Sequence, residues 1–221
     1  MKLFWTPASP FVRKVMVAAI ELGVDSRIDI HPTYWPHDWA TQTVEFDEAF
    51  VAANPIGRIP ALITDDGVAL AESNWICAYL DSLVDKPRLF PFSGKAHWEM
   101  LGLLAIADGA IEAMFLRRAE TLRHRPERSG RFIGKQRDRI ARCLDQVELA
   151  VPTLDRTALN MTHIASGIAC SYMDFRYGQD DWRKGRPQLS RWHADFAQRP
   201  SMARTRPGET PQRNPKTAVQ T

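Results

Sequence analysis

The sequence predicts an α/β domain followed by an all-α domain built as a helical bundle, and three observations support this prediction. The first third of the chain alternates short aliphatic segments with helical patterns and closes with a strand–turn–strand–helix run. A stretch with helix-breaking residues at Pro87, Pro91 and Gly94 follows. Beyond it, apolar residues recur at helical spacing almost to the end of the chain. The expected divisions are an α/β domain at 1–81, a linker at 82–94, a helical domain at 95–200 and a tail at 201–221.

The first three elements are expected to form a strand–helix–strand unit. Met1–Trp5 is a mostly apolar strand, and a short loop leads to Pro10, which suits the first position of a helix. Apolar residues continue at helical spacing until Gly23, where the helix ends. Ser26–Ile30 alternates like a second strand. This order of elements implies a right-handed crossover and a parallel pair of strands.

A helix and a hairpin complete the first domain. After a loop rich in Trp and Pro, we expect a helix over Val44–Ala53. Ala61–Thr64 and Val68–Leu70 are short strands on either side of an Asp-Asp-Gly turn. The next helical pattern follows Ser73 and places its apolar residues on one face. The resulting order, β-α-β-α-β-β-α, predicts a thioredoxin-like domain.

Four helices are expected in the second domain. Pro126, Pro152 and Pro200 are interpreted as helix stops, because proline cannot continue a helix. The tail after Pro200 holds three prolines and almost no apolar periodicity, which predicts a loosely ordered segment. The four helices are expected at about Lys95–His124, Arg128–Ala150, Met161–Tyr177 and Pro187–Ala197.

The composition is typical of a soluble globular protein. Of the 221 residues, 44% are hydrophobic and 25% are charged, with a formal net charge of only +3. No segment approaches the ~20 apolar residues that cross a membrane, and the N-terminus lacks the apolar run of a secretory signal. No metal-ligand spacing occurs among the His and Cys residues, so no metal is expected. The odd number of widely spaced cysteines predicts buried free thiols and a cytoplasmic protein. They are Cys77, Cys143 and Cys170.

A basic run between Arg123 and Arg142 raises the hypothesis of a nucleic-acid partner. Glu127 and Asp138 interrupt the run, and no stacking aromatic residues are interleaved with it. A solvated helix face is therefore the better interpretation, and neither nucleic acid nor a membrane is expected as a partner.

The stretch Asn54–Leu80 carries most of the functional signal. Only about 5–6% of X-Pro bonds are cis, so the default expectation for the Ile59-Pro60 bond is trans. A cis bond would instead turn the N–H and C=O of Ile59 outward, where they could pair with an extended peptide. At the next helix start, free N–H groups bind carboxylates, and Glu72 would hold an ammonium beside Ser73. The ordinary alternative is that Ser73 caps the helix and Glu72 favours its dipole.

This stretch, NPIGRIPALITDDGVALAESNWICAYL, resembles the glutathione-binding half of the glutathione S-transferase family. The family pattern is a turn, a Val- or Ile-cis-Pro, a hairpin, and Glu-Ser opening a helix. SPFVRKV from Ser9 resembles the N-terminal segment of the serine-type members. ADGAIEAMFLRR from Ala107 and LNMTHIASGIACSYMDFR from Leu159 resemble two helices of the second domain in bacterial members. The resemblance covers nearly the whole chain and implies a homodimeric detoxification enzyme with glutathione as co-substrate.

Ser9 is the residue expected to activate the thiol of glutathione. An unperturbed thiol has a pKa near 8.5, and lowering it by about two units requires roughly 2.7 kcal/mol of differential stabilisation. A helix N-terminus and one hydroxyl hydrogen bond together supply this amount. Ser9 precedes Pro10, so it also serves as an ordinary helix cap, but a hydroxyl can accept a helix N–H and still donate to sulfur. Thr6 is the alternative hydroxyl. The family's tyrosine-type members would have Tyr near Trp5, and its cysteine-type members would have Cys in this loop.

The resemblance implies further site residues. Ile59 and Pro60 would hold the cysteinyl backbone of glutathione, and Glu72 and Ser73 its γ-glutamyl end. Arg58 either lies beside this site or is a solvated surface residue. Trp35 and Trp39 would wall the groove unless they are packing residues. The candidates for the apolar pocket of the second substrate, equally consistent with core positions, are Met114, Phe115 and Tyr172.

The predicted function is a transferase that adds the glutathione thiolate to an electrophilic, partly apolar small molecule. Two alternatives stay open: a glutathione-dependent peroxidase, dehalogenase or ether-cleaving enzyme, and a non-catalytic interaction protein on the same fold. One departure from the family concerns the helix after Leu159, which usually opens with Ser or Thr and, three residues later, Asp. Here Asn160 and His163 fill these places, and His163 is not expected to complete the capping box as a carboxylate would.

Overall fold

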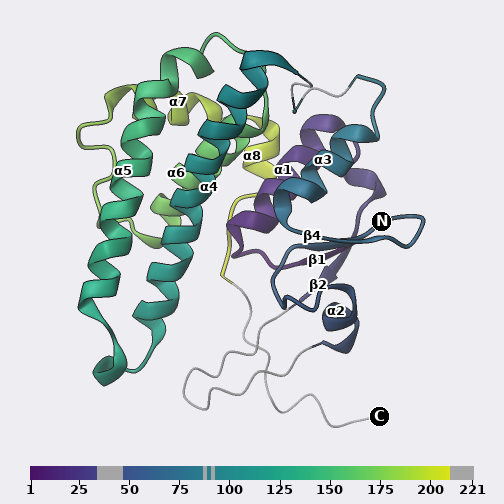
Figure 1. The fold of residues 1–221 in the computed structure, drawn as a ribbon, viewed down its shortest axis with the longest axis horizontal. Coiled ribbons are helices and arrows are strands. Elements are labelled where there is room, and N and C mark those ends of the chain that lie inside the picture. The colour runs from purple at the N-terminus through teal and green to yellow at the C-terminus, as the bar shows by residue number, and fades with distance from the viewer. Residues whose placement is uncertain (34–46, 87–88, 91–92, 210–221) are drawn as a thin grey trace.

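The computed structural model describes residues 1–33, 47–86, 89–90 and 93–209. Its first part is a four-stranded mixed sheet in the order β2-β1-β3-β4 (Figure 1). β1 pairs in parallel with β2, while β1–β3 and β3–β4 are antiparallel. The strands are β1 Lys2–Trp5, β2 Asp29–Pro32, β3 Ala61–Ile63 and β4 Ala69–Ala71.

Helices cover both faces of this sheet. α1 (Pro10–Leu22) and α3 (Ser73–Ser82) pack on the face that carries Leu3 and Leu62. The short α2 (Glu48–Ala53) packs Phe50 against Phe4 on the opposite face. The thioredoxin-like arrangement is therefore confirmed, since successive strand residues face opposite sides and both sides are buried.

The remainder of the described chain is helical. α4 and α5 form a long adjacent pair (Figure 1), and α6 packs against both α4 and α1. α6 is the central helix of this region, because Met161 to Cys170 are buried without interruption. Within the described ranges no helix is long and apolar enough to cross a membrane. The helices are α4 Gly94–Leu122, α5 Gly130–Leu154, α6 Met161–Arg176, α7 Pro187–Phe196 and α8 Pro200–Arg204, with short 3-10 turns at Asp25–Arg27 and Arg125–Glu127.

Asp81 binds the backbone of the predicted linker at Leu89 and Phe90. It is a buried residue in the last turn of α3, and its carboxylate accepts the N–H groups of Leu89 at 3.1 Å and Phe90 at 3.2 Å. The carbonyl of Leu89 in turn accepts the N–H of Met161, the first residue of α6, at 3.0 Å. One carboxylate thus ties the end of the α/β part to the central helix of the helical part.

The second strand begins three residues later than predicted and ends two residues later. Asp25–Arg27 form a 3-10 turn, and β2 runs from Asp29 to Pro32 because Asp29 is the register partner of Lys2. Ile28 is buried just before the strand, whereas Ile30, on this edge strand, is 41% exposed. The apolar–polar alternation therefore misplaced the strand, because Ile30 is an apolar residue exposed on the sheet edge.

The helix expected over Val44–Ala53 begins at Glu48, and Asp47 is its N-cap. Residues 44–46 lie outside the described ranges.

Pro152 does not stop α5, which continues to Leu154. Proline has no N–H, so only one backbone hydrogen bond is lost this close to the helix end. The N–H of Asp155 still donates to the Val151 carbonyl at 2.8 Å and so completes the last turn of α5.

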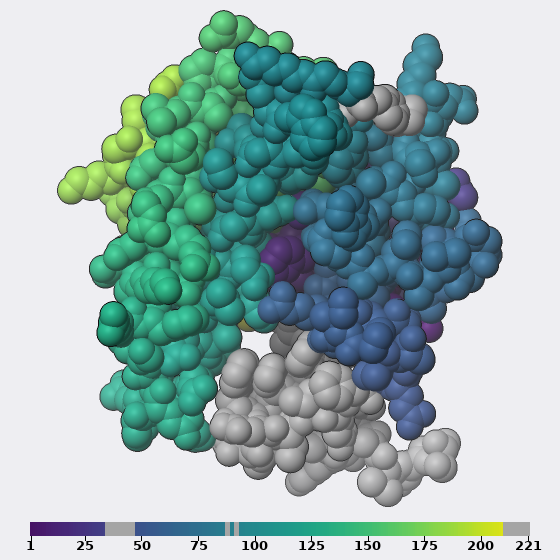
Figure 2. All heavy atoms as spheres, viewed as in Figure 1, coloured from purple at the N-terminus to yellow at the C-terminus, as the bar shows by residue number. Residues whose placement is uncertain are grey.

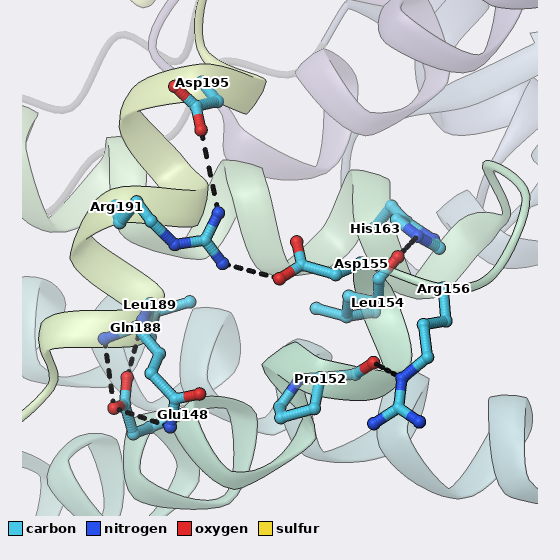
Figure 3. A network of polar contacts seen from close by, with 10 residues as sticks. All are labelled: Glu148, Pro152, Leu154, Asp155, Arg156, His163, Gln188, Leu189, Arg191 and Asp195. Carbon is cyan, nitrogen blue, oxygen red and sulfur yellow. Dashed lines mark hydrogen bonds and ion pairs between the residues drawn. The ribbon is translucent and has the colours of Figure 1, made fainter.

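Glu148 of α5 binds the start of α7. Its carboxylate accepts backbone N–H groups there, including that of Leu189 at 2.6 Å (Figure 3).

The expectation that His163 leaves the α6 cap incomplete is wrong. Its Nδ1 accepts the N–H of Asn160 at 3.2 Å, and its Nε2–H donates to the Leu154 carbonyl at 3.0 Å (Figure 3). The Asn160 side chain accepts the N–H of Thr162 at 3.0 Å. The imidazole lone pair thus replaces a carboxylate oxygen, provided that the ring is neutral. Burial lowers the pKa of His163, which favours this neutral form.

The expectation of a loosely ordered tail from residue 201 is also wrong for its first part. α8 buries Ser201 and Met202 against α1. Arg199 places its guanidinium on the Glu21 carboxylate of α1, with Nε and Nη2 at 2.8 and 2.7 Å. A two-pronged ion pair and one apolar side chain therefore hold a segment that has no apolar periodicity. Residues 210–221 lie outside the described ranges.

Candidate active site

Ser9 lies at the N-terminus of α1, directly after the loop that follows β1. Its backbone is extended, and its Oγ accepts the N–H of Val12 at 3.2 Å, as a helix cap does. The residue is half-buried and lines a cavity of about 180 Å³. Because the cap uses only a lone pair of Oγ, the Ser9 O–H proton is available as a donor.

The start of α3 presents Glu72 and Ser73. Glu72 is exposed and is itself the N-cap, since its carboxylate accepts the N–H of Asn74 at 3.1 Å and the hydroxyl of the buried Ser73 at 3.2 Å. Among the described residues, Glu72 alone combines a side chain with a positive φ, 70°. Such a conformation costs on the order of 1–3 kcal/mol and concentrates at functional sites. The strained backbone holds a carboxylate and a hydroxyl together at one helix mouth.

The peptide bond between Ile59 and Pro60 is cis. Ile59 is half-buried, and neither its N–H nor its C=O has a hydrogen-bond partner within the described part of the chain. Asn54 shapes the preceding turn, with its side chain accepting from Ile56 N–H at 3.1 Å and donating to the Arg58 carbonyl at 2.5 Å. The main chain just before β3 is therefore free to pair with an extended ligand.

A hollow separates the helical part from the α/β part. Figure 2 shows this hollow with atoms of the N-terminal segment on its floor, α4 on one side and the region before β3 on the other. Arg58 crosses between the two parts, since its guanidinium lies 3.4 Å from the Glu112 carboxylate and 5.8 Å from the ring centroid of Phe115. Arg58 thus reaches toward α4, while 60% of its side chain remains exposed to solvent.

A buried polar cluster lies behind the mouth of α3. Lys14 of α1 is fully buried, and its ammonium lies 2.7 Å from Asp108 of α4 and 2.9 Å from the side-chain oxygen of Asn74. Asn74 also donates to the second oxygen of Asp108 at 2.8 Å. The cluster joins three helices and fixes the position of the residue that follows Ser73.

Two of the three residues predicted for the second-substrate pocket are core residues. Met114 has no exposed surface, and Tyr172 is buried in the core of the helical part. Phe115 is 42% exposed on α4. None of the three lines the cavity beside Ser9, and Trp35 and Trp39 lie outside the described ranges.

The cavity beside Ser9 includes residues that the sequence analysis did not select. Arg13 follows Ser9 by one helical turn, a spacing that could have drawn attention to it. Arg204, Thr205 and Arg206 come from the tail, where no sequence signal placed them. A larger hollow of about 470 Å³ is lined by α5 residues alone, and none of the predicted site residues borders it.

The cysteines do not contribute a nucleophile here. Burial raises the pKa of Cys77 to about 12 and also raises the pKa values of Cys143 and Cys170, so all three remain protonated thiols at neutral pH. Among the residues that the structure describes, His, Cys, Asp and Glu form no group of three or more that could hold a metal. A hydroxyl at a helix N-terminus is the chemical group that this site offers to a thiol.

Comparison with known proteins gives a consistent result. A family model described as "Glutathione S-transferase, N-terminal domain" matches residues 8–83. A glutathione transferase family member from Pseudomonas fluorescens Pf-5, solved with bound glutathione, has a TM-score of 0.86 and 38% identity, covering 94% of this chain and 99% of its own. A Methylobacillus flagellatus KT glutathione S-transferase with bound glutathione has a TM-score of 0.82 and 28% identity, covering 94% and 99%. The uncharacterised GST-like protein YibF of Escherichia coli K12 is 29% identical over 94% of this chain and 98% of its own.

Proposed function

Because the chain belongs to the glutathione S-transferase family, we propose that it is a glutathione transferase that converts the glutathione thiol to a thiolate for attack on a small electrophile. The observation that carries the proposal is the Ser9 hydroxyl, which caps α1, keeps its proton available and borders an open cavity. The Pseudomonas and Methylobacillus relatives, each solved with glutathione, support this choice of co-substrate.

In the proposed complex, glutathione lies across the mouth of α3 and the chain before β3. Glu72 takes the γ-glutamyl ammonium, and the Ser73 hydroxyl with the first N–H groups of α3 takes its carboxylate. The free N–H and C=O of Ile59 pair with the cysteinyl backbone beside Pro60. These contacts orient the thiol toward Ser9.

Ser9 then stabilises the thiolate. Its O–H donates to the sulfur, and the N-terminal end of α1 adds a favourable dipole. A two-unit fall from a thiol pKa near 8.5 requires roughly 2.7 kcal/mol, which is within reach of these two contributions. The thiolate attacks the electrophile, a sulfur–carbon bond forms, and the leaving group departs with its electron pair. We further propose that the protein acts as a homodimer in the cytoplasm, where its cysteines stay reduced.

Replacing Ser9 with Ala tests the proposal. We expect Ser9→Ala to bind glutathione normally, measured by calorimetry, and to lose about 10²-fold in kcat, as when one preorganised donor to a developing anion is removed. Ser129→Ala is the matched control, because Ser129 caps α5 in the same way, with Phe132 N–H at 3.1 Å. Both variants lose a cap, but only Ser9→Ala should lose turnover.

Two outcomes would redirect the assignment. Unchanged turnover in Ser9→Ala would move thiol activation to Thr6, whose Thr6→Val variant would then be the inactive one. The wild-type protein should also be retained on immobilised glutathione and be eluted by free glutathione. If it is not retained, an interaction protein on the same fold becomes the favoured assignment. Turnover of an aromatic halide compared with a peroxide separates a transferase from a peroxidase.

A further inference from the structure

We propose that the cavity beside Ser9 is a carboxylate subsite formed by Arg13 and Arg206, and that the electrophile therefore carries a carboxylate group. This inference names the substrate class of the proposed transferase and rests on that function. It concerns residues on the Arg13 face of α1 and the tail, not the predicted pocket residues on α4 and α6.

Arg13 is a buried cation that has no carboxylate partner among the residues that the structure describes. It is 7% exposed, and its guanidinium donates from Nη2 to the Met202 carbonyl at 3.0 Å and from Nε to the Thr205 hydroxyl at 3.3 Å. Both acceptors are neutral, and no Asp or Glu of the described residues forms an ion pair with it. A guanidinium has further N–H donors beyond these two. Burying an unpaired charge is costly, so an anion in the cavity would complete this site.

Arg206 adds a second positive charge to the same cavity. It is exposed, and it forms no ion pair within the described part of the chain. Burial, reinforced by the nearby charge of Arg206, lowers the pKa of Arg13 to about 10. Two like charges facing one cavity repel each other unless an anion lies between them.

Arg204 provides the internal contrast. It borders the same cavity, but its guanidinium is paired with the Asp25 carboxylate at 2.6 Å. An arginine on this rim can therefore pair with a protein carboxylate, whereas Arg13 and Arg206 form no such pair with any described residue. The difference distinguishes a general basic surface from a pair of cations left open to a ligand.

The size and walls of the cavity favour a short aliphatic acid. A volume of about 180 Å³ corresponds to about six water-sized units at about 30 Å³ each, enough for a carboxylate with two or three carbons. Its remaining walls include Trp5, Val12, Met16 and Ile30, which would pack against a hydrocarbon chain. Inorganic phosphate would leave these apolar walls without contacts.

The placement of Ser9 on the same cavity connects the subsite to the reaction. With a short halocarboxylate, the glutathione thiolate forms the sulfur–carbon bond as the carbon–halogen bond breaks, and halide leaves with the electron pair. The carboxylate remains with Arg13 and Arg206 throughout. Arg13 is thus a substrate-binding residue, and no further co-reactant is needed.

The test compares two glutathione adducts of the same shape and different charge. S-(2-carboxyethyl)glutathione carries the carboxylate, and S-(2-carbamoylethyl)glutathione replaces it with a neutral amide. We expect the wild-type protein to bind the acid at least 10-fold more tightly, measured by calorimetry at fixed ionic strength. In Arg13→Gln the ratio should fall to about 1, while Arg204→Gln should keep the wild-type ratio. Glutathione itself should bind all three proteins equally.

The possible failures are distinguishable. Equal binding of acid and amide by the wild-type protein, or an unchanged preference in Arg13→Gln, would overturn the subsite and leave the proposed function intact. Absence of glutathione binding would overturn both. Arg206→Ala lies on the exposed tail and leaves the helical core untouched, so it provides a second variant should Arg13→Gln fail to fold. We expect it to reduce the acid preference about 3-fold or more, and no reduction would contradict the role of Arg206.

Discussion

Arg13 and Lys14 are consecutive residues of α1, and both are buried cations, but their surroundings differ. The ammonium of Lys14 meets the carboxylate of Asp108 and the amide of Asn74, which are themselves hydrogen-bonded to each other. Within the described ranges, the guanidinium of Arg13 donates to a carbonyl and a hydroxyl and to no carboxylate, and it borders a cavity. One face of α1 is electrostatically closed, and the other is open.

This difference separates structural charges from ligand-binding charges more reliably than burial does. Burial alone would rank Lys14 above Arg13, since Lys14 is completely inaccessible. What distinguishes the two is whether the protein itself supplies the opposite charge. A buried charge that is paired within the protein, like that of Lys14, helps to hold α1, α3 and α4 together. A buried charge that lacks such a pair and borders a cavity, like that of Arg13, favours the binding of a ligand of opposite charge.

The largest expected effect comes from breaking the closed face. Lys14→Met should lower the free energy of unfolding by about 3–5 kcal/mol, because it leaves the Asp108 carboxylate partly buried without its cation. Urea denaturation followed by circular dichroism measures this loss. Adding Asp108→Asn to Lys14→Met should recover part of the stability, since the unpaired charge is then removed. A loss below about 1 kcal/mol in the single variant would show that Lys14 and Asp108 do not form the stabilising buried ion pair that their 2.7 Å separation indicates.

The next effect concerns pH and a buried histidine of α7 that is influenced by the charge of Arg13. His193 of α7 contacts the Ser171 hydroxyl at 3.0 Å, and burial lowers its pKa to about 4, with the nearby charges of Arg183 and Arg13 acting in the same direction against Asp174. Between pH 6.5 and 4 the unfolded chain binds a proton at His193 that the native protein does not. Native stability from this group is therefore complete above pH 6.5 and falls by about 3 kcal/mol by pH 4.

His193→Gln isolates this contribution. His163, whose pKa is also lowered by burial, and the carboxylates respond to the same acidification, so the informative quantity is the difference between wild type and variant. Unfolding free energies measured at pH 7, 5.5 and 4 should converge as the pH falls if His193 is buried neutral. Parallel curves would show that His193 is protonated at little cost in the native state.

Much of the architecture could be predicted because local patterns specify it. Helical spacing and a closing Gly23 placed α1, and the turn between two short aliphatic runs placed the β3–β4 hairpin. The same stretch holds Glu72 and Ser73 at one helix mouth, as a local motif can indicate. These features depend on residues close together in the sequence.

The features that sequence reasoning missed depend on distant partners. α8 is held by Arg199 on Glu21, 178 positions earlier, and no periodicity records that pair. The α6 cap depends on the tautomer of His163, which the Leu154 carbonyl selects. The sequence analysis did not select Arg13, because its burial depends on contacts with Met202 and Thr205 of the distant tail. Long-range hydrogen bonds and burial by an irregular segment leave no local signature.

The smallest expected effect is on the stability of the open face itself. Arg13→Met removes two hydrogen bonds to the tail, but it also removes an unpaired buried charge and its repulsion with Arg206. These contributions oppose each other, so the free energy of unfolding in dilute buffer should change by less than about 1 kcal/mol. The neighbouring variant Lys14→Met provides the comparison under identical urea conditions. A loss in Arg13→Met as large as that in Lys14→Met would mean that the charge of Arg13 is already paired within the protein. Removing one member of an ion pair leaves the other charge buried without a partner, and that is what produces a large loss of stability.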